Sequence, residues 1–226
     1  MNLPEPTSMI SSHSADPQEW LTLEQLLSAP IYEALRARCT DAFIDLRRRR
    51  RVRATPGLSV LFEGVETVLL QVYEVLRAEG WGLARAQREL AEYAPLLPGP
   101  RRLSATAMID SSERAQGRRL ARSLRRRGAL VLRAGALSAV SEPVDDEPDD
   151  SPVHYLGFTI DEHLTAAIAH GRPLVLAVDT DSHAAEVALA PALVRELARD
   201  LAPHPHPTPL LRGLKPHRTA RQEHHK

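Results

Sequence analysis

The sequence predicts an α+β fold, in which a mainly antiparallel sheet packs against several helices around a single core. Segments with apolar residues three and four apart mix irregularly with short segments of alternating polarity, which indicates helices and strands in one chain. The strands are joined by too few long crossovers for a regular βαβ series. The chain has 226 residues and one cysteine, so its core forms without an internal disulfide.

The first third of the chain contains a polar N-terminal segment and a long helix. Residues 1–15 are rich in proline and serine, which predicts disorder. Asp16-Pro17-Gln18-Glu19 has the pattern of a helix start. Apolar residues at helical spacing predict a helix from Pro30 to about Arg51, which Thr55-Pro56-Gly57 ends.

The central elements follow from the same two periodicities. We expect a short strand at 59–62, followed by helices at 65–78 and 83–93. A half-buried strand at 103–110, a basic helix at 112–127 and a hairpin at 129–140 should come next.

Beyond the hairpin, residues 141–152 predict an acidic loop broken by prolines. Two strands and two helices are expected after it, at residues 153–160, 161–170, 174–178 and 191–201. Residues 202–226, rich in Pro, His and Arg, predict a disordered tail. The expected organisation is therefore one domain over residues 16–201.

Charge is distributed unevenly although the net charge is zero. Residues 36–133 contain 21 Arg and 10 acidic residues, a balance of +11, whereas residues 1–35 and 134–226 carry −5 and −6. A basic middle indicates either an anionic partner or charge pairing within the molecule. A partner or an anion would dock on the arginines at the end of the first long helix: Arg47, Arg48, Arg49, Arg50, Arg51 and Arg53.

The sequence predicts neither a signal peptide nor a membrane span. The first 20 residues contain no basic stretch followed by an apolar run, and no apolar run approaches the roughly 20 residues of a membrane span. We therefore expect a soluble, cytoplasmic protein with no membrane association.

A polar stripe follows the helix expected at residues 65–78. On a helical wheel Glu63, Thr67, Gln71 and Glu74 fall within about 80° of one another, opposite the valines. Such a stripe is either a solvated face or a site that binds a transition metal such as iron. In the second case Glu63 and Glu74 would be joined by His154 or His183 as ligands.

Several segments together resemble a bacterial family known as domain of unknown function 3501. They are RRRRRV (47–52), LFEGVETVLLQVYEVLRAE (61–79), YAPLLPGPRRLSATAMID (93–110), VHYLGF (153–158) and LVRELARDL (193–201). Residues that match the family pattern include Phe62, Glu63, Thr67, Gln71, Glu74 and the LSAT run at 103–106. Gly64 and Val75 stand where that pattern usually has Asn and Met.

The resemblance implies a one-domain protein with no assigned activity. Genes of this family often lie beside genes for rubrerythrin-like di-iron proteins and iron–sulfur oxidoreductases, which implies an accessory role with a redox partner. Three hypotheses follow: an accessory protein that binds such a partner, a metal-dependent enzyme with a carboxylate and histidine site, and a nucleic-acid-binding protein that uses its arginines. The sequence leaves it open whether the protein is an enzyme.

Overall fold

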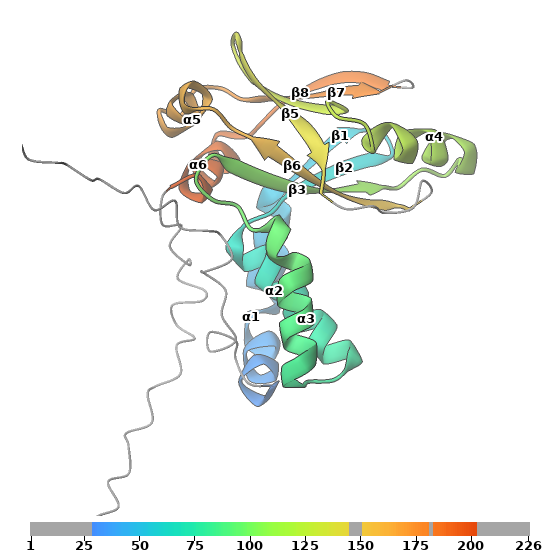
Figure 1. The fold of residues 1–226 in the computed structure, drawn as a ribbon, viewed down its shortest axis with the longest axis vertical. Helices are drawn as coiled ribbons and strands as arrows, with labels where there is room; N and C mark the ends of the chain where they lie inside the picture. Colours follow the sequence, from blue (N-terminus) through green and yellow to red (C-terminus); the bar gives the residue numbers. More distant parts are fainter. Residues whose placement is uncertain (1–28, 145–150, 181–182, 203–226) are drawn as a thin grey trace, which may run out of the picture.

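The computed structural model describes residues 29–144, 151–180 and 183–202. Eight antiparallel strands form one sheet in the order β1-β2-β3-β6-β5-β4-β7-β8. They are β1 (Arg51–Thr55), β2 (Leu58–Phe62), β3 (Arg102–Ile109), β4 (Leu130–Ala134), β5 (Leu137–Pro143), β6 (Val153–Thr159), β7 (Val175–Thr180) and β8 (His183–Ala188). The sheet curls until β1 contacts β8, so it is nearly barrel-shaped (Figure 1).

Helices lie on one side of the curled sheet and at its ends. They are α1 (Ala29–Arg50), α2 (Val65–Glu79), α3 (Leu83–Tyr93) with the 3-10 turn η3 (Ala94–Leu96), α4 (Arg114–Leu124), α5 (Glu162–Ala169) and α6 (Pro191–Asp200). Figure 1 shows α1, α2 and α3 projecting together from the sheet, with α4 on one flank and α5 and α6 on the other.

The main core fills the inside of the curled sheet. Alternate residues of β3, Leu103, Ala105 and Ala107, point into it and are fully buried. Ser104 and Thr106 lie on the opposite, outer face, and they are buried as well. The outer face of β3 is therefore covered, and α2 and η3 cover it.

Helix α2 is packed on several sides. Val68 contacts Leu96 and Leu97 after α3, and Leu76 packs near Ala86 of α3. On another side, α2 places Tyr73 against Tyr32 of α1, and their rings stack with centroids 4.6 Å apart. Most of the apolar arc that the sequence predicts is buried, Val65 and Val75 are half-buried, and the neighbouring helices bury further residues.

The structure confirms the predicted α+β fold with a mainly antiparallel sheet. Most predicted elements are present, with ends shifted by at most three residues, and α3 has the bounds that the sequence predicts. Two strands, β1 and β8, are additional, and β5 continues to Pro143, inside the expected acidic loop. Residues 51–55 form a strand because Val52 and Ala54 enter the core while Arg51 and Arg53 face outward.

Other predictions concern residues outside those that the structure describes. These are the disordered N-terminus at 1–15, the helix start at 16–19, most of the acidic loop, and the disordered tail expected at 202–226, of which only Ala202 is described. Across the described part of the chain, every helix is too short or too polar to cross a lipid bilayer.

Candidate functional site

Glu63 forms the centre of a buried polar cluster between α2 and the outer face of the sheet. Its backbone N–H donates to Ser104 O at 2.9 Å, which continues the pairing of β2 with β3. The Glu63 carboxylate accepts a hydrogen bond from Thr106 Oγ1 at 2.5 Å and another from the hydroxyl of Thr67. Only 1 % of Glu63 is exposed to solvent, so these two hydroxyls replace water around the carboxyl group.

The chemistry of Glu63 is dominated by its burial. Burial raises the pKa of the Glu63 carboxyl above its ordinary value, although the hydroxyls of Thr106 and Thr67 and the charge of Arg50 favour the ionised form. Such a group is suited to holding a proton. Because the cluster is closed to solvent, that proton would be held inside the fold.

Arg50 borders this cluster and joins three parts of the chain. Its Nε donates to Phe62 O at 2.8 Å, and its Nη2 donates to Glu63 O at 2.8 Å. The same guanidinium forms ion pairs with Asp200, and with Glu196 at 3.2 Å. Burial raises the pKa of Asp200 to about 6 even though Arg50 opposes the shift. Arg50 thus links the end of α1, the turn after β2 and α6.

Gly64 lets the guanidinium approach the backbone. A Cβ atom at this position would lie 2.8 Å from Arg50 Cζ, closer than atoms in contact allow. Gly64 also begins α2, where its N–H donates to Thr67 Oγ1 at 2.8 Å. The residue that departs from the usual family pattern therefore has a local reason in this chain.

The two remaining residues of the predicted stripe have other neighbours. Gln71 Nε2 donates to Tyr155 OH at 3.4 Å, on β6. Glu74 Oε1 accepts from Tyr32 OH at 2.5 Å and from Arg36 Nε at 2.7 Å, both on α1. Burial alone would raise the pKa of Glu74, but these hydrogen bonds outweigh it and hold the pKa below its ordinary value. The residues of the stripe therefore have different surroundings: Glu63 and Thr67 lie in the buried cluster, Gln71 lies beside β6, and Glu74 lies beside α1.

The histidines proposed as metal ligands lie elsewhere in the sheet. His154 is buried on β6 and pairs with Ala107, so it points to the inner face, whereas Thr106 and Glu63 lie on the outer face. His154 Nε2 lies 2.9 Å from Ser151 O. His183 begins β8, and its side chain is outside the described part of the structure.

Glu63 and Glu74 are also far apart, because Glu63 precedes α2 and Glu74 lies about 13.5 Å along the helix axis from Val65, at a rise of about 1.5 Å per residue. Among the side chains that the structure describes, no three His, Cys, Asp or Glu residues gather as metal ligands would. The arrangement therefore does not bring Glu63, Glu74 and His154 into one ligand set.

The predicted docking arginines differ in their exposure. Arg50 is 3 % exposed and serves the interior contacts given above. Arg47 is half-buried, and the remaining four are exposed at the end of α1 and along β1: Arg48, Arg49, Arg51 and Arg53.

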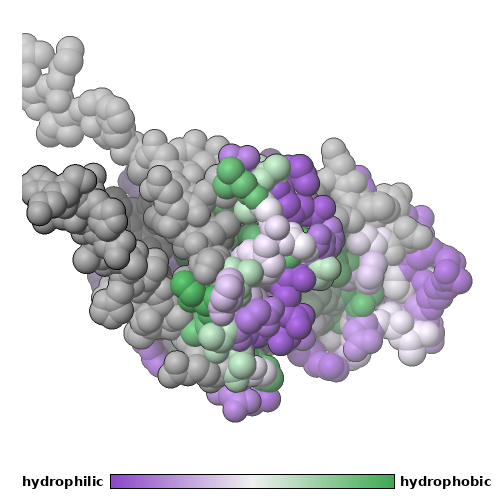
Figure 2. All heavy atoms as spheres, turned by 90° about the horizontal axis from the view of Figure 1, so that it is seen from below, coloured by the Kyte–Doolittle hydropathy of each residue, from purple (hydrophilic) through white to green (hydrophobic). Residues whose placement is uncertain are grey.

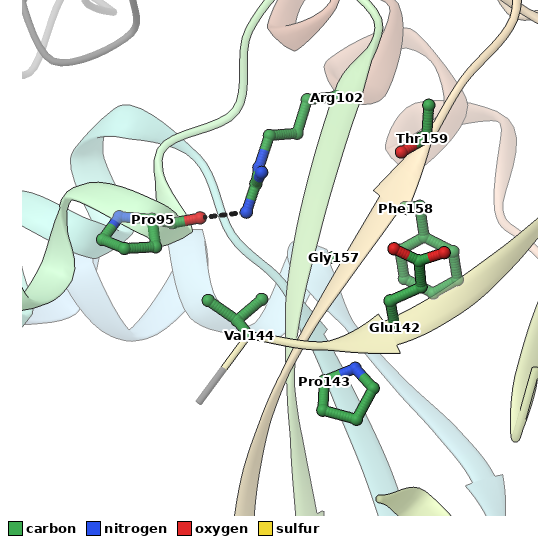
Figure 3. Close-up of a pocket in the computed structure, with 8 residues that line it drawn as sticks. All are labelled: Pro95, Arg102, Glu142, Pro143, Val144, Gly157, Phe158 and Thr159. Carbon is green, nitrogen blue, oxygen red and sulfur yellow. Dashed lines mark hydrogen bonds between the residues drawn. The ribbon is translucent and has the colours of Figure 1, made fainter. Parts of the chain in front are cut away.

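A pocket of about 270 Å³ lies farther along the same outer face (Figure 3). Arg102 on β3 and Thr159 on β6 are paired residues at one side of it, and Glu142 on β5 lies across Gly157. Pro95 of η3 contributes a backbone carbonyl, which accepts from Arg102 Nη2 at 2.8 Å.

Sequence reasoning missed this pocket, although two signals for it exist. Arg102 has the same parity as Ser104 and Thr106, which places all three on one face of β3. A glycine inside a strand, such as Gly157 in VHYLGF, often marks a close approach of another group. Both residues lie in segments that carry the family resemblance.

Comparisons with known proteins agree with the resemblance. A crystal structure described as a novel protein of unknown function from Burkholderia pseudomallei K96243 is 28 % identical, with a TM-score of 0.73. The similarity covers 80 % of this chain and 99 % of that chain. No curated protein matches the chain. Residues 20–201 match the family described as "Protein of unknown function (DUF3501)", and the chain therefore belongs to that family.

Proposed function

We propose that this protein is an accessory protein that binds an acidic protein partner through an arginine surface, formed by Arg48, Arg49, Arg51 and Arg53. The observation that supports this proposal is the contrast with Arg50. The buried Arg50 fastens the end of α1 to the sheet and to α6, while its four neighbours face solvent. The exposed charges are therefore presented from a fixed backbone.

The charges of this surface are weakly engaged within the protein. Arg48 lies 3.6 Å from Asp45, and Arg49 lies 3.3 Å from Glu196. The Arg48–Asp45 pair is exposed on both sides and is worth about 1 kcal/mol or less, so a partner can replace it. Glu196 also pairs with Arg50, so this carboxylate keeps a cation if Arg49 turns to a partner. Arg51 contacts Met108 Sδ at 3.5 Å, and within the described residues no carboxylate pairs with Arg51 or Arg53.

An acidic redox protein is the partner class that we propose, either a rubrerythrin-like di-iron protein or an iron–sulfur oxidoreductase. The gene neighbourhood implied by the family resemblance supports this class. Opposite charges on the two surfaces would steer the encounter and fix its orientation. Seen from below in Figure 2, the described part of the surface mixes hydrophilic areas with smaller hydrophobic ones.

Binding of purified partners to the full chain tests the proposal. The probes are the rubrerythrin-like protein and the iron–sulfur oxidoreductase encoded nearest to this gene, measured by biolayer interferometry at low and high salt. We expect the four-residue variant R48E/R49E/R51E/R53E to bind at least about tenfold more weakly. The matched control is R114E/R118E/R119E/R122E, which reverses four exposed charges on α4.

Equal losses in both variants would mean that total charge, rather than the arginine surface, governs binding. Failure of both probes to bind at low salt would refute the redox-partner proposal. Steeply salt-dependent binding to duplex or single-stranded DNA, with no protein binding, would support the nucleic-acid hypothesis instead.

The metal-dependent enzyme is the remaining alternative. Its proposed ligands Glu63, Glu74 and His154 have separate surroundings, and this gives it less support than the arginine surface has. Elemental analysis of protein that lacks residues 202–226, expressed with added iron, tests it. Stoichiometric iron that is lost in Glu63→Gln would favour the enzyme.

A further inference from the structure

Arg102 has an unusual surrounding for a partly buried cation. Its Nη2 is bonded to Pro95 O, but its Nε is buried with no hydrogen-bond partner. Within the described residues no carboxylate pairs with it, although a guanidinium carries five N–H donors. A buried charged donor without an acceptor costs free energy. Arg102 also lines the adjoining pocket, so a ligand there can offer acceptors to the guanidinium.

Gly157 creates the space for such a ligand. A Cβ atom there would lie 3.4 Å from Val144 Cγ2 and 3.5 Å from Arg102 Nη2. Any side chain at this position would thus stand directly before the guanidinium. The volume of about 270 Å³ equals roughly nine waters at about 30 Å³ each, which limits the ligand to a small molecule.

Glu142 determines which charge the other end of the ligand can carry. It lines the pocket on the far side of Gly157, two strands from Arg102. Its carboxylate pairs with Arg127 at 2.9 Å, and both side chains are at least half exposed. A carboxylate has room for about four hydrogen bonds, so Glu142 can accept from a ligand as well. A second negative charge on the ligand would be repelled.

We propose that this pocket binds a small zwitterion whose carboxylate pairs with Arg102 and whose ammonium lies toward Glu142. Thr159, which faces Arg102 across the β3–β6 pair, offers its hydroxyl to the same carboxylate. The planar guanidinium matches a carboxylate through two parallel hydrogen bonds, using donors that are now unpaired. Across the sheet the pocket presents the cation of Arg102, then the space over Gly157, then the anion of Glu142. This order is complementary to an amino acid whose carboxylate and ammonium are separated by a short chain.

Three probes of one length test this assignment. 4-Aminobutyrate, pentanoate and glutarate share a carboxylate and a three-carbon spacer, and end in an ammonium, a methyl and a second carboxylate. Inorganic phosphate is the fourth probe. Titrations of the full chain, labelled with ¹⁵N-arginine, follow the Nε–H signal of Arg102 by NMR, assigned from its loss in Arg102→Lys.

We expect a saturable shift with 4-aminobutyrate, a weaker one with pentanoate, and the weakest with glutarate and phosphate. Arg102→Gln should weaken binding of 4-aminobutyrate by about tenfold or more. Glu142→Gln should remove the preference over pentanoate. Gly157→Ala should weaken all ligands by filling the pocket, with contacts that the fold tolerates.

The matched control is Arg101→Gln, the same change at the neighbouring residue, which is exposed and lies 3.7 Å from Glu162. It should leave every affinity unchanged. Thermal unfolding of each variant separates loss of binding from loss of structure. The proposal is wrong if no probe gives a saturable shift at Arg102, if phosphate or glutarate binds best, or if Gly157→Ala binds as the wild type does.

Discussion

Arg50 and Asp200, 150 residues apart in the chain, form a buried ion pair that fastens the end of α1 to α6. The same guanidinium holds two backbone carbonyls in the turn that leads to α2. One side chain therefore fixes the backbone just before α2, beside the cluster around Glu63.

Replacing Arg50 by Met should destabilise the protein strongly. The change leaves Asp200 and the carbonyls of Phe62 and Glu63 buried without a donor, and breaking such a pair costs about 3–5 kcal/mol. Urea denaturation measures this change in the free energy of unfolding. The control is Arg49→Met, which removes an exposed cation bonded to the same Glu196 and should cost less than about 1 kcal/mol. Equal costs would show that the buried contacts of Arg50 contribute little.

Gly64→Ala should be destabilising because its methyl group would meet Arg50 Cζ at 2.8 Å. The guanidinium is held by its own bonds, so relief of this contact should cost about 1–3 kcal/mol. Gly82→Ala is the matched control, since Gly82 begins α3 with extended backbone and nothing lies within 4 Å of its Cβ position. Chemical denaturation of both variants measures how much each lowers the free energy of unfolding. A similar loss at both sites would assign it to helix capping rather than to Arg50.

Glu63→Gln should alter the pH dependence of stability. Because the folded protein has a raised Glu63 pKa, it binds this proton more tightly than the unfolded chain does. The contribution of Glu63 is therefore most favourable at pH below the ordinary pKa of 4.5, and it declines as pH rises through the folded pKa. Relative to the wild type, Glu63→Gln should become more stable as pH increases.

Urea denaturation of both proteins between acidic and neutral pH measures this difference. The raised pKa of Asp200 affects both proteins alike and cancels. A difference in stability that does not vary with pH would show that the pKa of Glu63 is not raised in the fold.

Tyr32→Phe should change the pH dependence of stability through Glu74, with the opposite sign to the effect of Glu63. The hydroxyl of Tyr32 donates to Glu74 and helps to hold the pKa of Glu74 low. A lowered pKa gives stability that is present above the ordinary value and is lost as pH falls through the folded value. The variant should lose about 1 kcal/mol at neutral pH, and this loss should shrink in acid. A loss that is equally large at low pH would show that packing of the ring, rather than its hydroxyl, is responsible.

Local periodicity determined most of the elements. Leu83–Tyr93 and Val65–Glu79 have apolar residues at helical spacing, and Arg102–Ile109 alternates, so neighbours in sequence suffice to predict them. Strand β1 was missed because a run of arginines resembles the basic end of a helix. Its strand character comes from Val52 and Ala54, which enter a core built by distant segments.

The sequence by itself also determined the family, the basic middle of the chain and the polar residues along α2. Tertiary structure alone decided which of these residues meet. The pairing of β2 with β3 brings Glu63 to Thr106, and the packing of α1 on α2 brings Tyr32 to Glu74. Arg102, Glu142 and Gly157 face one pocket because three strands pair in an order that differs from their order in sequence. Such contacts depend on long-range pairing and side-chain direction, which spacing along one segment does not encode.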